Sequence, residues 1–293
     1  MKKNPAKNPG YRRGVPLAEY GILRPWLTIP IRRTTLPALL CYLAVVIRDF
    51  FTLQYCARRG PTAAAVVPVD HPLDALVPFR PDLAALYLDF INYWIRPFSM
   101  ALRRYPGKKG LCLCRDFLTL LRVTYREAAR VYRFRLSTTA RPPCTTPLIC
   151  RIRRIDPHLL CVPSLHVAIL ALTWAYWRDV LNAEGRAMAE DLWAGALNIT
   201  ESVLYVKQHS VNCISAALHM TNRLIPTLFT PADAVSFIDA LFREAPDITA
   251  EAQGQLREYM RRLFDRFQSD PAGSSDWAQP VKDWLAAWEA APH

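Results

Sequence analysis

The sequence has 293 residues, of which 52% are hydrophobic, and it contains 24 prolines but only 10 glycines, a composition that excludes a disordered chain. Eight cysteines are too few for a disulfide scaffold in a chain of this length. The net charge of +12 is compatible with nucleic-acid binding, but basic residues beside membrane spans explain this charge with fewer assumptions. We therefore expect a membrane, and no nucleic acid, as the partner.

The first 35 residues are basic and are interrupted by five prolines, with Glu19 as their only acid. This segment (1–35) predicts a cytoplasmic arm lying against anionic lipid headgroups, and a plain flexible tail is the alternative. The first apolar run covers residues 36–55, and no cleavable signal peptide is apparent before it. Arg48 and Asp49 lie inside this run, where each charge costs roughly 3 kcal/mol unless it is paired or faces other helices.

Five further apolar runs predict helices, at residues 83–102, 111–132, 162–177, 192–206 and 211–225. Several are shorter than the ~20 residues that a helix needs to cross ~30 Å of hydrocarbon, so adjoining polar positions must complete them. The run at 111–132 is the least apolar, and a helix lying outside the bilayer is its alternative. We predict an all-α fold, in which residues 36–229 form a polytopic transmembrane bundle of about six spans.

Basic clusters at 1–35, 103–109 and 178–186 fall on one side if each run crosses once, and the positive-inside rule makes that side cytoplasmic. The loop at 133–162 is then outside, although it is rich in arginine. A phosphate-binding pocket would explain these cations, and so would a wrong span count. Three cysteines share this loop (Cys144, Cys150 and Cys161), and two of them could pair in an oxidising compartment.

The pattern changes after Thr230, which together with Pro231 is typical of a helix start. A second helix begins after Thr249 and carries one apolar stripe, formed by Leu256, Met260, Leu263, Phe264 and Phe267. Trp277, Trp284 and Trp288 mark a short third helix. Residues 230–293 are predicted to form a small cytoplasmic helical appendage.

Two histidines stand at the ends of apolar runs with cations nearby. Pro163-Ser164-Leu165-His166 opens the run at 162–177, and Lys207-Gln208-His209 closes the run at 192–206. Two imidazoles and fixed positive charge suit a phosphate ester: one ring attacks phosphorus, the other protonates the leaving oxygen, and cations hold the remaining oxygens.

These motifs carry a family resemblance. Pro163 to His166 resembles the Pro-Ser-x-His signature of the type 2 phosphatidate phosphatase superfamily, and Ser202 to His209 resembles its third motif. Arg141-Pro142 is similar to the Arg-Pro of the first motif. Residues 71–81 resemble the Ile-Pro-Phe-x-Pro entry to a span in bacterial relatives near inositol phosphorylceramide synthases. The resemblance covers roughly residues 70–225.

The resemblance implies a lipid-linked phosphate substrate, no metal and no cofactor, and a protein of the bacterial inner (cytoplasmic) membrane; the basic clusters predict that its site faces outward. His209 would attack phosphorus to give a phosphohistidine, and His166 would protonate the departing alkoxide. The phosphate-binding residues would be Arg141, Lys207, Ser164 and, as a substitute, Arg135. The lipid, the choice between hydrolysis and head-group transfer, and the oligomeric state are left open.

The chain departs from the family at two positions. Cys213 stands where the family has an aspartate that orients the nucleophilic histidine, and Phe134 stands where it has a lysine. The alternative function is therefore a degenerate member that binds anionic lipid or a partner without turnover, and Cys213→Asp is expected to raise turnover. The other histidines are interpreted as structural (His71, His158, His219 and His293), and the role of Asp156 is left open.

Overall fold

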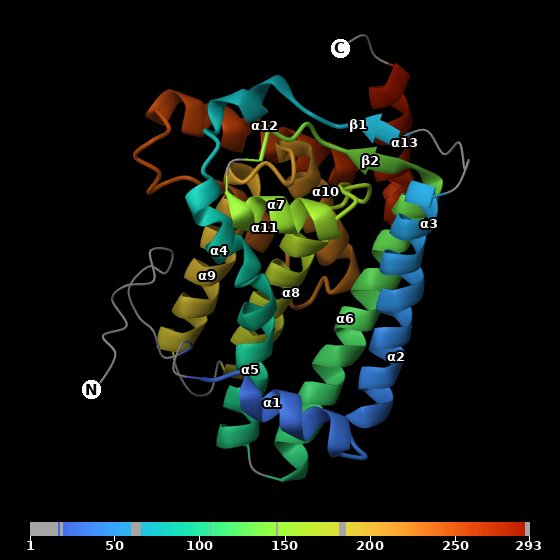
Figure 1. The fold of residues 1–293 in the computed structure, drawn as a ribbon, viewed down its shortest axis with the longest axis vertical. Helices are drawn as coiled ribbons and strands as arrows, with labels where there is room; N and C mark the ends of the chain where they lie inside the picture. Colours follow the sequence, from blue (N-terminus) through green and yellow to red (C-terminus); the bar gives the residue numbers. More distant parts are fainter. Residues whose placement is uncertain are drawn as a thin grey trace.

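The computed structural model describes residues 17, 20–59, 66–105, 107–144, 146–181 and 186–290. Helices hold 75% of the residues and strands 3%, so the predicted all-α class is confirmed. Five helices run roughly along the long axis (Figure 1). They are α2 (Leu36–Val46), α5 (Phe90–Arg104), α6 (Lys108–Phe134), α8 (Leu165–Leu181) and α9 (Arg186–Tyr205). The remaining long helices are α10 (Val211–Leu224), α11 (Pro231–Ala240), α12 (Ala250–Ser269) and α13 (Ala278–Ala290).

Short elements fill the two ends of the molecule. α1 (Leu23–Thr28) crosses the end opposite to β1 (Val66–Pro68), β2 (Leu136–Thr138) and α12 (Figure 1). The two strands pair in parallel. The other short helices are α3 (Leu53–Arg59), α4 (Ala84–Leu88) and α7 (Pro147–Ile155), with 3-10 turns at Ile29–Ile31, Pro72–Leu76, Pro81–Leu83 and Pro271–Ser274 and a π-helical segment at Ile47–Thr52.

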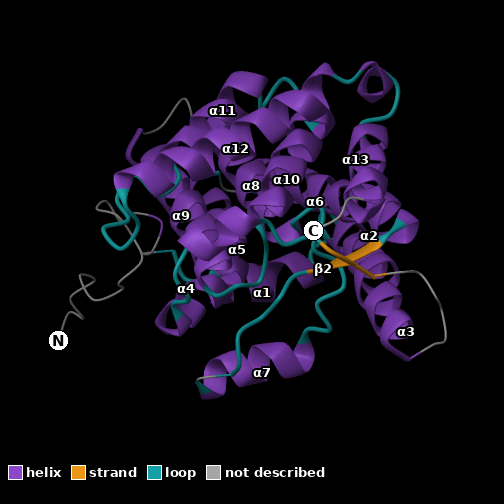
Figure 2. Cartoon of the chain, turned by 90° about the horizontal axis from the view of Figure 1, so that it is seen from above, coloured by secondary structure: helices purple, strands orange, loops and turns teal. Residues whose placement is uncertain are grey.

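α8 and α10 form the centre of the fold. They lie near the middle when the molecule is seen from above (Figure 2). Their side chains are almost all buried: α8 is apolar around most of its circumference, and the buried polar side chains of α10, such as Ser215 and Asn222, are hydrogen-bonded. α8 packs against α5, α6, α9 and α10, and α12 covers the outer side of α10. The residues at the ends of these two buried helices are therefore held in fixed positions by the core.

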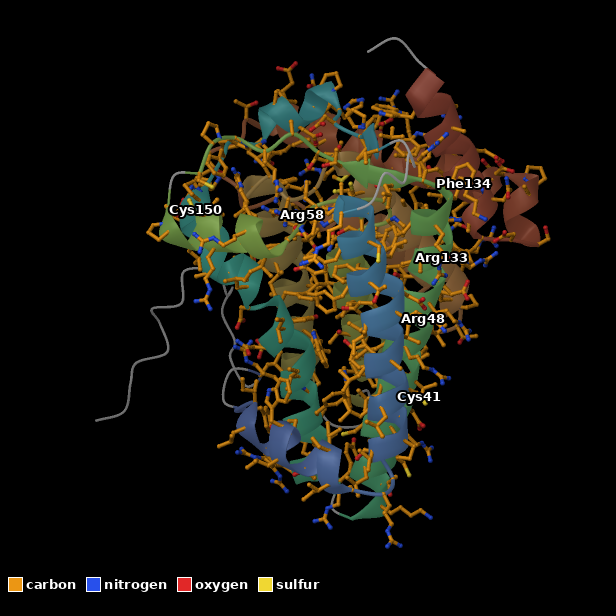
Figure 3. All side chains as sticks on the ribbon, turned by 45° about the vertical axis from the view of Figure 1, so that its right-hand side comes forward. Cys41, Arg48, Arg58, Arg133, Phe134 and Cys150 are labelled. Carbon is orange, nitrogen blue, oxygen red and sulfur yellow. The ribbon has the colours of Figure 1, made fainter. Side chains whose placement is uncertain are left out.

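Within the described residues, one helix is long and apolar enough to cross a membrane. It is the continuous helix Leu36–Arg59, made of α2, the π-helical segment and α3. The other expected spans do not meet that test; α5, α8 and α10 have only 15, 17 and 14 residues. The charges expected to be costly here are paired, since Asp49 accepts hydrogen bonds from Arg48 (2.7 Å) and from Arg133 of α6. Figure 3 shows Arg48 and Arg133 on these two helices.

Two segments expected to lack regular structure contain elements. The arm at 1–35 lies mostly outside the described residues, but α1 belongs to it, and Arg24 donates to the carbonyl of Leu102 (2.9 Å). The loop at 133–162 contains β2 and α7. Thr146 caps α7, accepting from the backbone N–H of Ile149 (3.3 Å). Both elements are short and are held by a cap or by strand pairing, so the hydrophobic periodicity of the sequence did not predict them.

The C-terminal helices begin where the sequence predicts. Thr230 forms a capping box with Asp233 at α11, and Thr249 caps α12. The predicted apolar stripe of α12 is buried, and it belongs to the same hydrophobic cluster as α8 and α10. Residues after Thr230 thus share the central core, whereas the sequence predicted that they form a separate appendage.

The tail also contacts the histidine end of the molecule. The Tyr259 hydroxyl donates to Oδ1 of Asn212 (2.6 Å), three residues after His209, and Trp288 donates to the carbonyl of Pro68 (3.1 Å). The ring of His71 stacks on Tyr259 with centroids 3.9 Å apart. These contacts exclude the expected placement of tail and histidines on opposite faces of a membrane.

Candidate active site

His166 is the second residue of α8, and its position is fixed by the start of that helix. The hydroxyl of Ser164 accepts from the N–H of Val167 (3.4 Å), and the N–H of Ser164 donates to the carbonyl of Cys213 in α10 (3.3 Å). The first turns of α8 and α10 are thereby joined. Ser164 is fully buried and serves this cap, so its N–H is not available to a phosphate.

His209 lies in the tight turn between α9 and α10. Lys207 has a positive φ of 56°, which turns the chain sharply before His209, and Ser210 caps α10. Nδ1 of His209 lies 3.2 Å from the carbonyl oxygen of Cys161. Because a carbonyl only accepts, Nδ1 carries the proton, and in the neutral ring Nε2 keeps its lone pair.

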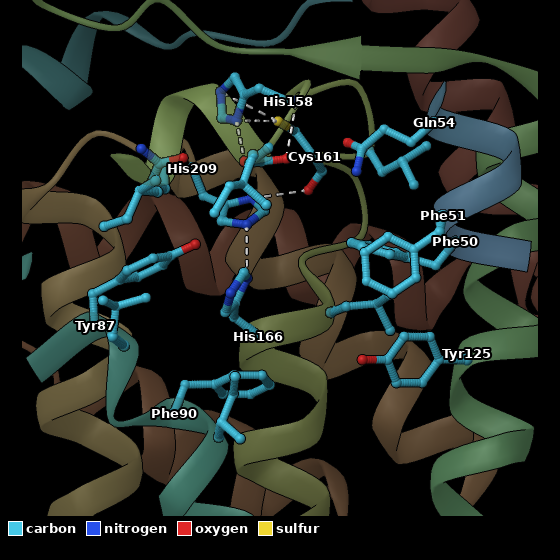
Figure 4. A pocket seen from close by; sticks show the side chains of 18 of the residues that line it. Phe50, Phe51, Gln54, Tyr87, Phe90, Tyr125, His158, Cys161, His166 and His209 are labelled. Carbon is cyan, nitrogen blue, oxygen red and sulfur yellow. Dashed lines mark hydrogen bonds and ion pairs between the residues drawn. The ribbon is translucent and has the colours of Figure 1, made fainter. Parts of the chain in front are cut away.

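The two motif histidines meet. Nε2 of His209 lies 3.4 Å from Nδ1 of His166, and the ring planes make an angle of 67° (Figure 4). The His166 ring is flanked by Tyr87 and Phe90, with centroids 5.0 and 4.7 Å away. The structure therefore brings together residues 43 positions apart in the sequence and aims the free nitrogen of one ring at the other.

Burial shapes the chemistry of His209. Burial lowers the pKa of His209 well below its usual value, and the neighbouring His166 and His158 lower it further. Asp156 and the Cys161 carbonyl act in the opposite direction but do not reverse the shift. The ring is consequently neutral at neutral pH, which is the form that can act as a nucleophile.

The histidine pair stands at the polar end of a cavity of about 650 Å³. The rest of the cavity is mostly apolar and aromatic, and Figure 4 shows several of these side chains around the two rings. The apolar lining includes Tyr42, Phe50, Phe51, Leu88, Ile91, Trp94, Tyr125, Leu148, Ile152, Ile155 and Leu160. Such a cavity suits an amphipathic ligand with a small polar group and an apolar body.

A third histidine joins the site, contrary to the interpretation of His158 as a structural residue unrelated to the motifs. Its ring centroid is 6.4 Å from that of His209, and Nε2 lies 2.7 Å from Oγ1 of Thr139. Nδ1 of His158 is 3.7 Å from Oδ2 of Asp156, which also accepts the His158 backbone N–H on Oδ1 (3.0 Å). Nothing in the spacing of His158 signalled this, because it reaches the site through a backbone turn with a φ of 61°.

Asp156 supplies a carboxylate close to the imidazoles. Burial raises its pKa, but its hydrogen bond to His158 and the charges of His158 and Arg141 outweigh burial and hold the pKa below its usual value. Asp156 is also the sole acid among the cavity-lining residues that the structure describes. Asp156 therefore brings a negative charge to the histidine end of the cavity, through its contacts with His158.

Arg141 lies beside the same polar end. Its electrostatic neighbours are Asp156, Cys161 and Tyr87, and burial lowers its pKa. Its Nη1 is buried and has no hydrogen-bond partner among the described residues. A buried guanidinium nitrogen without a protein partner can donate to an anion, and nitrogens of Arg122, Arg153 and Arg223 are in the same state among the described residues.

Two other expected phosphate ligands lie elsewhere. Nζ of Lys207 donates to the backbone carbonyls of Asp74 (2.6 Å) and Val77, so it ties the turn to the segment after β1. Arg135 lies at the junction of α6 and β2, with its guanidinium 5.9 Å from the ring of Phe134. None of the three cations lines the cavity in the described structure, but only Arg141 has the cavity-lining residues Asp156 and Tyr87 as electrostatic neighbours, and we assign only Arg141 to the site.

Neither Asn212 nor Cys213 orients the His209 ring. Asn212 donates to the carbonyl of Val69 (3.0 Å) and accepts from Tyr259, while Cys213 is fully buried. All eight cysteines lie in described parts of the chain and are free thiols, including the three in the loop at 133–162. The carbonyl of Cys161 is thus the group that fixes the His209 tautomer.

The distance between the rings limits what the site can hold in this conformation. For a phosphoryl group between them, attack and leaving-group protonation require the two nitrogens to be roughly 6 Å apart. The observed 3.4 Å leaves no space for phosphorus in line. Rotation of the His166 ring, which stands against the cavity, would open the gap.

No family model, no curated protein and no solved structure matches this chain.

Proposed function

We propose that the protein hydrolyses or transfers the phosphate of a lipid-linked phosphate ester through a phosphohistidine on His209. One observation carries the proposal: Nε2 of His209 faces Nδ1 of His166 at 3.4 Å, at the polar end of a large and otherwise apolar cavity. The resemblance of both histidine motifs to the type 2 phosphatidate phosphatase superfamily supports the same chemistry.

The first step forms a bond between Nε2 of His209 and phosphorus as the bond from phosphorus to the lipid oxygen breaks. His166, which burial keeps neutral in the free protein, takes up a proton as the anionic phosphate binds beside it and gives this proton to that oxygen, and the lipid leaves as an alcohol. Neutral His166 then takes a proton from water or from an acceptor alcohol. The oxygen attacks phosphorus, and the P–N bond breaks with its electrons returning to His209. Arg141 and Asp156 balance the charges that change in these steps.

We propose further that the chain is an integral membrane protein of several spans. The continuous apolar helix Leu36–Arg59 supports this, as does the apolar cavity. Although the arginines of the loop at 133–162 lie at the histidine end, basic residues also gather at the opposite end, at Arg24 of α1, at Arg32 and Arg33 after it and at the turn between α5 and α6. By the positive-inside rule that end is cytoplasmic, so the site and the C-terminal helices would face outward, in the inner membrane of a bacterium.

The alternative is a degenerate family member that binds anionic lipid without turnover. It is favoured by the absence of a carboxylate on the His209 ring, whose Nδ1 proton goes to a backbone carbonyl. A carbonyl fixes the tautomer but does not neutralise a cationic ring. Loss of the equivalent carboxylate in a serine-protease triad costs ~10⁴ in turnover, so a slow enzyme and an inactive one are both compatible with this contact.

Phosphate release from a panel of lipid phosphates decides between the two. The full-length protein, purified in detergent, is incubated with a phosphatidate, a polyprenyl diphosphate and a phosphosphingolipid. We expect release from at least one substrate, a fall of at least about 10³-fold in His209→Asn, and no change in His71→Asn. His71 is a fair control because it caps a turn outside the cavity, a role that asparagine also performs. Binding of these lipids without release would favour the degenerate alternative.

A further inference from the structure

Two glutamines line the cavity, and both side chains are buried, at 2% exposure for Gln54 and 1% for Gln208. Oε1 of Gln54 accepts a hydrogen bond from the backbone N–H of Leu159 (3.2 Å). Neither the oxygen nor the nitrogen of the Gln208 amide has a partner in the described part of the chain. The same residue type thus occurs twice on one cavity, once satisfied and once not.

An unsatisfied amide at this position needs an explanation. Leaving a buried donor and acceptor unpaired costs free energy, and an apolar side chain of the same size would avoid the cost. The backbone of Gln208 does not require this side chain. Its N–H donates to the carbonyl of Val203 (3.0 Å), and the backbone N–H of another residue type would make the same bond. The side chain is therefore better explained by a group that enters the cavity.

The position of Gln208 identifies that group. It directly precedes His209, the proposed nucleophile, and both residues line the cavity. An amide offers a donor and an acceptor side by side. A phosphate monoester in its monoanionic form offers the matching pair, a P–O oxygen that accepts and a P–OH that donates. A phosphodiester and a sulfate offer acceptors alone and would leave Oε1 of Gln208 unpaired.

We infer that Gln208 is a specificity-determining residue, whose amide binds the phosphoryl group of a protonated monoester by two hydrogen bonds and selects it over diesters. This inference rests on the proposed function and deepens it. It assigns the site a monoester substrate, and it explains why a costly polar side chain is kept beside the nucleophile.

Gln208→Met and Gln54→Met form a matched pair of tests, since methionine keeps nearly the length and volume of glutamine. The full-length protein in detergent is titrated at about pH 6 with inorganic phosphate, which is then mainly the monoanion, and with sulfate. Thermal unfolding is followed without ligand. We expect the wild type to prefer phosphate, Gln208→Met to bind phosphate about tenfold more weakly and to lose less affinity for sulfate, and Gln54→Met to bind both like the wild type.

The effects of the two variants on thermal stability should be the reverse of their effects on phosphate binding. Gln54→Met strips the Leu159 N–H of its partner and should lower the melting temperature by several degrees. Gln208→Met removes an unsatisfied group and should leave the melting temperature unchanged or raise it. A melting temperature that falls in both variants would show that the Gln208 amide is satisfied by bound water, and this would overturn the inference.

Different results would disprove the selective role of Gln208 and the proposed enzyme activity. If the wild type releases phosphate from lipids, and Gln208→Met keeps its preference for phosphate over sulfate, Gln208 has no selective role while the enzyme proposal stands. If the wild type binds phosphate selectively through Gln208 but releases none from any lipid, the binding role stands and the enzyme proposal fails. If it neither binds nor releases phosphate, both are wrong.

Discussion

The cavity has two unlike walls. One wall is formed by α8 and the turn between α9 and α10, where His166 and His209 sit among buried side chains. The other is formed by the helix Leu36–Arg59, which contributes Phe50 and Phe51 and leaves apolar side chains on the surface, Ile47 being 59% exposed. The groups that would do chemistry are held in the rigid interior, and the wall that would meet a lipid chain faces outward.

The largest difference in kinetic effect is expected between substitutions of cavity-lining residues in the two walls. We expect His166→Asn, in the buried wall, to lower turnover by about 10² to 10⁴-fold because it removes the general acid and base. Phe51→Leu, in the exposed wall, should raise KM a few-fold with little change in kcat, since it touches only the apolar part of the ligand. Steady-state kinetics on the best lipid phosphate measures both. Equal losses of kcat would erase the distinction between the walls.

The exposed wall can be tested for contact with lipid. Ile47 lies near the middle of the helix Leu36–Arg59. If this helix spans a membrane, Ile47→Arg should cost about 2.5 to 3.5 kcal/mol of insertion free energy, and the variant should be depleted from the membrane fraction. Ile47→Leu is the matched control and should behave like the wild type. Normal amounts of a stable Ile47→Arg protein in the soluble fraction would mean that this wall faces water.

Cys213 tests the buried wall. A gain of turnover from Cys213→Asp was expected from the sequence, but the residue is fully buried and Nδ1 of His209 already donates to Cys161. We now expect Cys213→Asp to be destabilised by about 1 to 3 kcal/mol relative to Cys213→Ala, with no higher turnover. Thermal unfolding and phosphate release measure the two effects. Higher turnover in the aspartate variant would show that the ring can exchange its carbonyl partner for a carboxylate.

The smallest effect concerns pH. Burial lowers the pKa of His209 in the folded state, so the unfolded chain takes up a proton first as the pH falls below about 6.5. Stability contributed by this group is present above pH 6.5 and is lost as the pH falls toward the folded pKa. Comparing unfolding at pH 7.5 and 5.5, His209→Asn should lose about 1 kcal/mol less than the wild type. The other titratable groups facing His209, namely His166, His158 and Asp156, are present in both proteins. Equal losses in the two proteins would contradict the lowered pKa.

Much of the fold was readable from local patterns. Each of the six apolar runs is helical over most of its length, and the caps at Thr230 and Thr249 place α11 and α12 within a residue or two. The meeting of His166 and His209 was predicted from the resemblance of their two motifs to one family and from the chemistry in which both rings act on a single phosphorus. Helix periodicity and capping are local properties, which is why one sequence suffices to read them.

The rest of the site depends on turns and long-range packing. The turn at Lys207 points its side chain away from the cavity, although its spacing to His209 suggested a ligand. His158 and Asp156 enter the site through a loop whose path no periodicity specifies. The unpaired amide of Gln208 has meaning only once its burial is known. The packing of the tail on α10 likewise could not be inferred from its own amphipathic pattern.

Trapping the phosphohistidine would show whether His209 is the nucleophile. The protein is mixed with a lipid phosphate labelled on phosphorus, quenched in alkali within the first turnover, digested, and the labelled peptide identified. Our account predicts label on His209 in the wild type, persistent label in His166→Asn because the second step is slowed, and none in His209→Asn. Turnover without label on His209, or label that survives in His209→Asn, would contradict it.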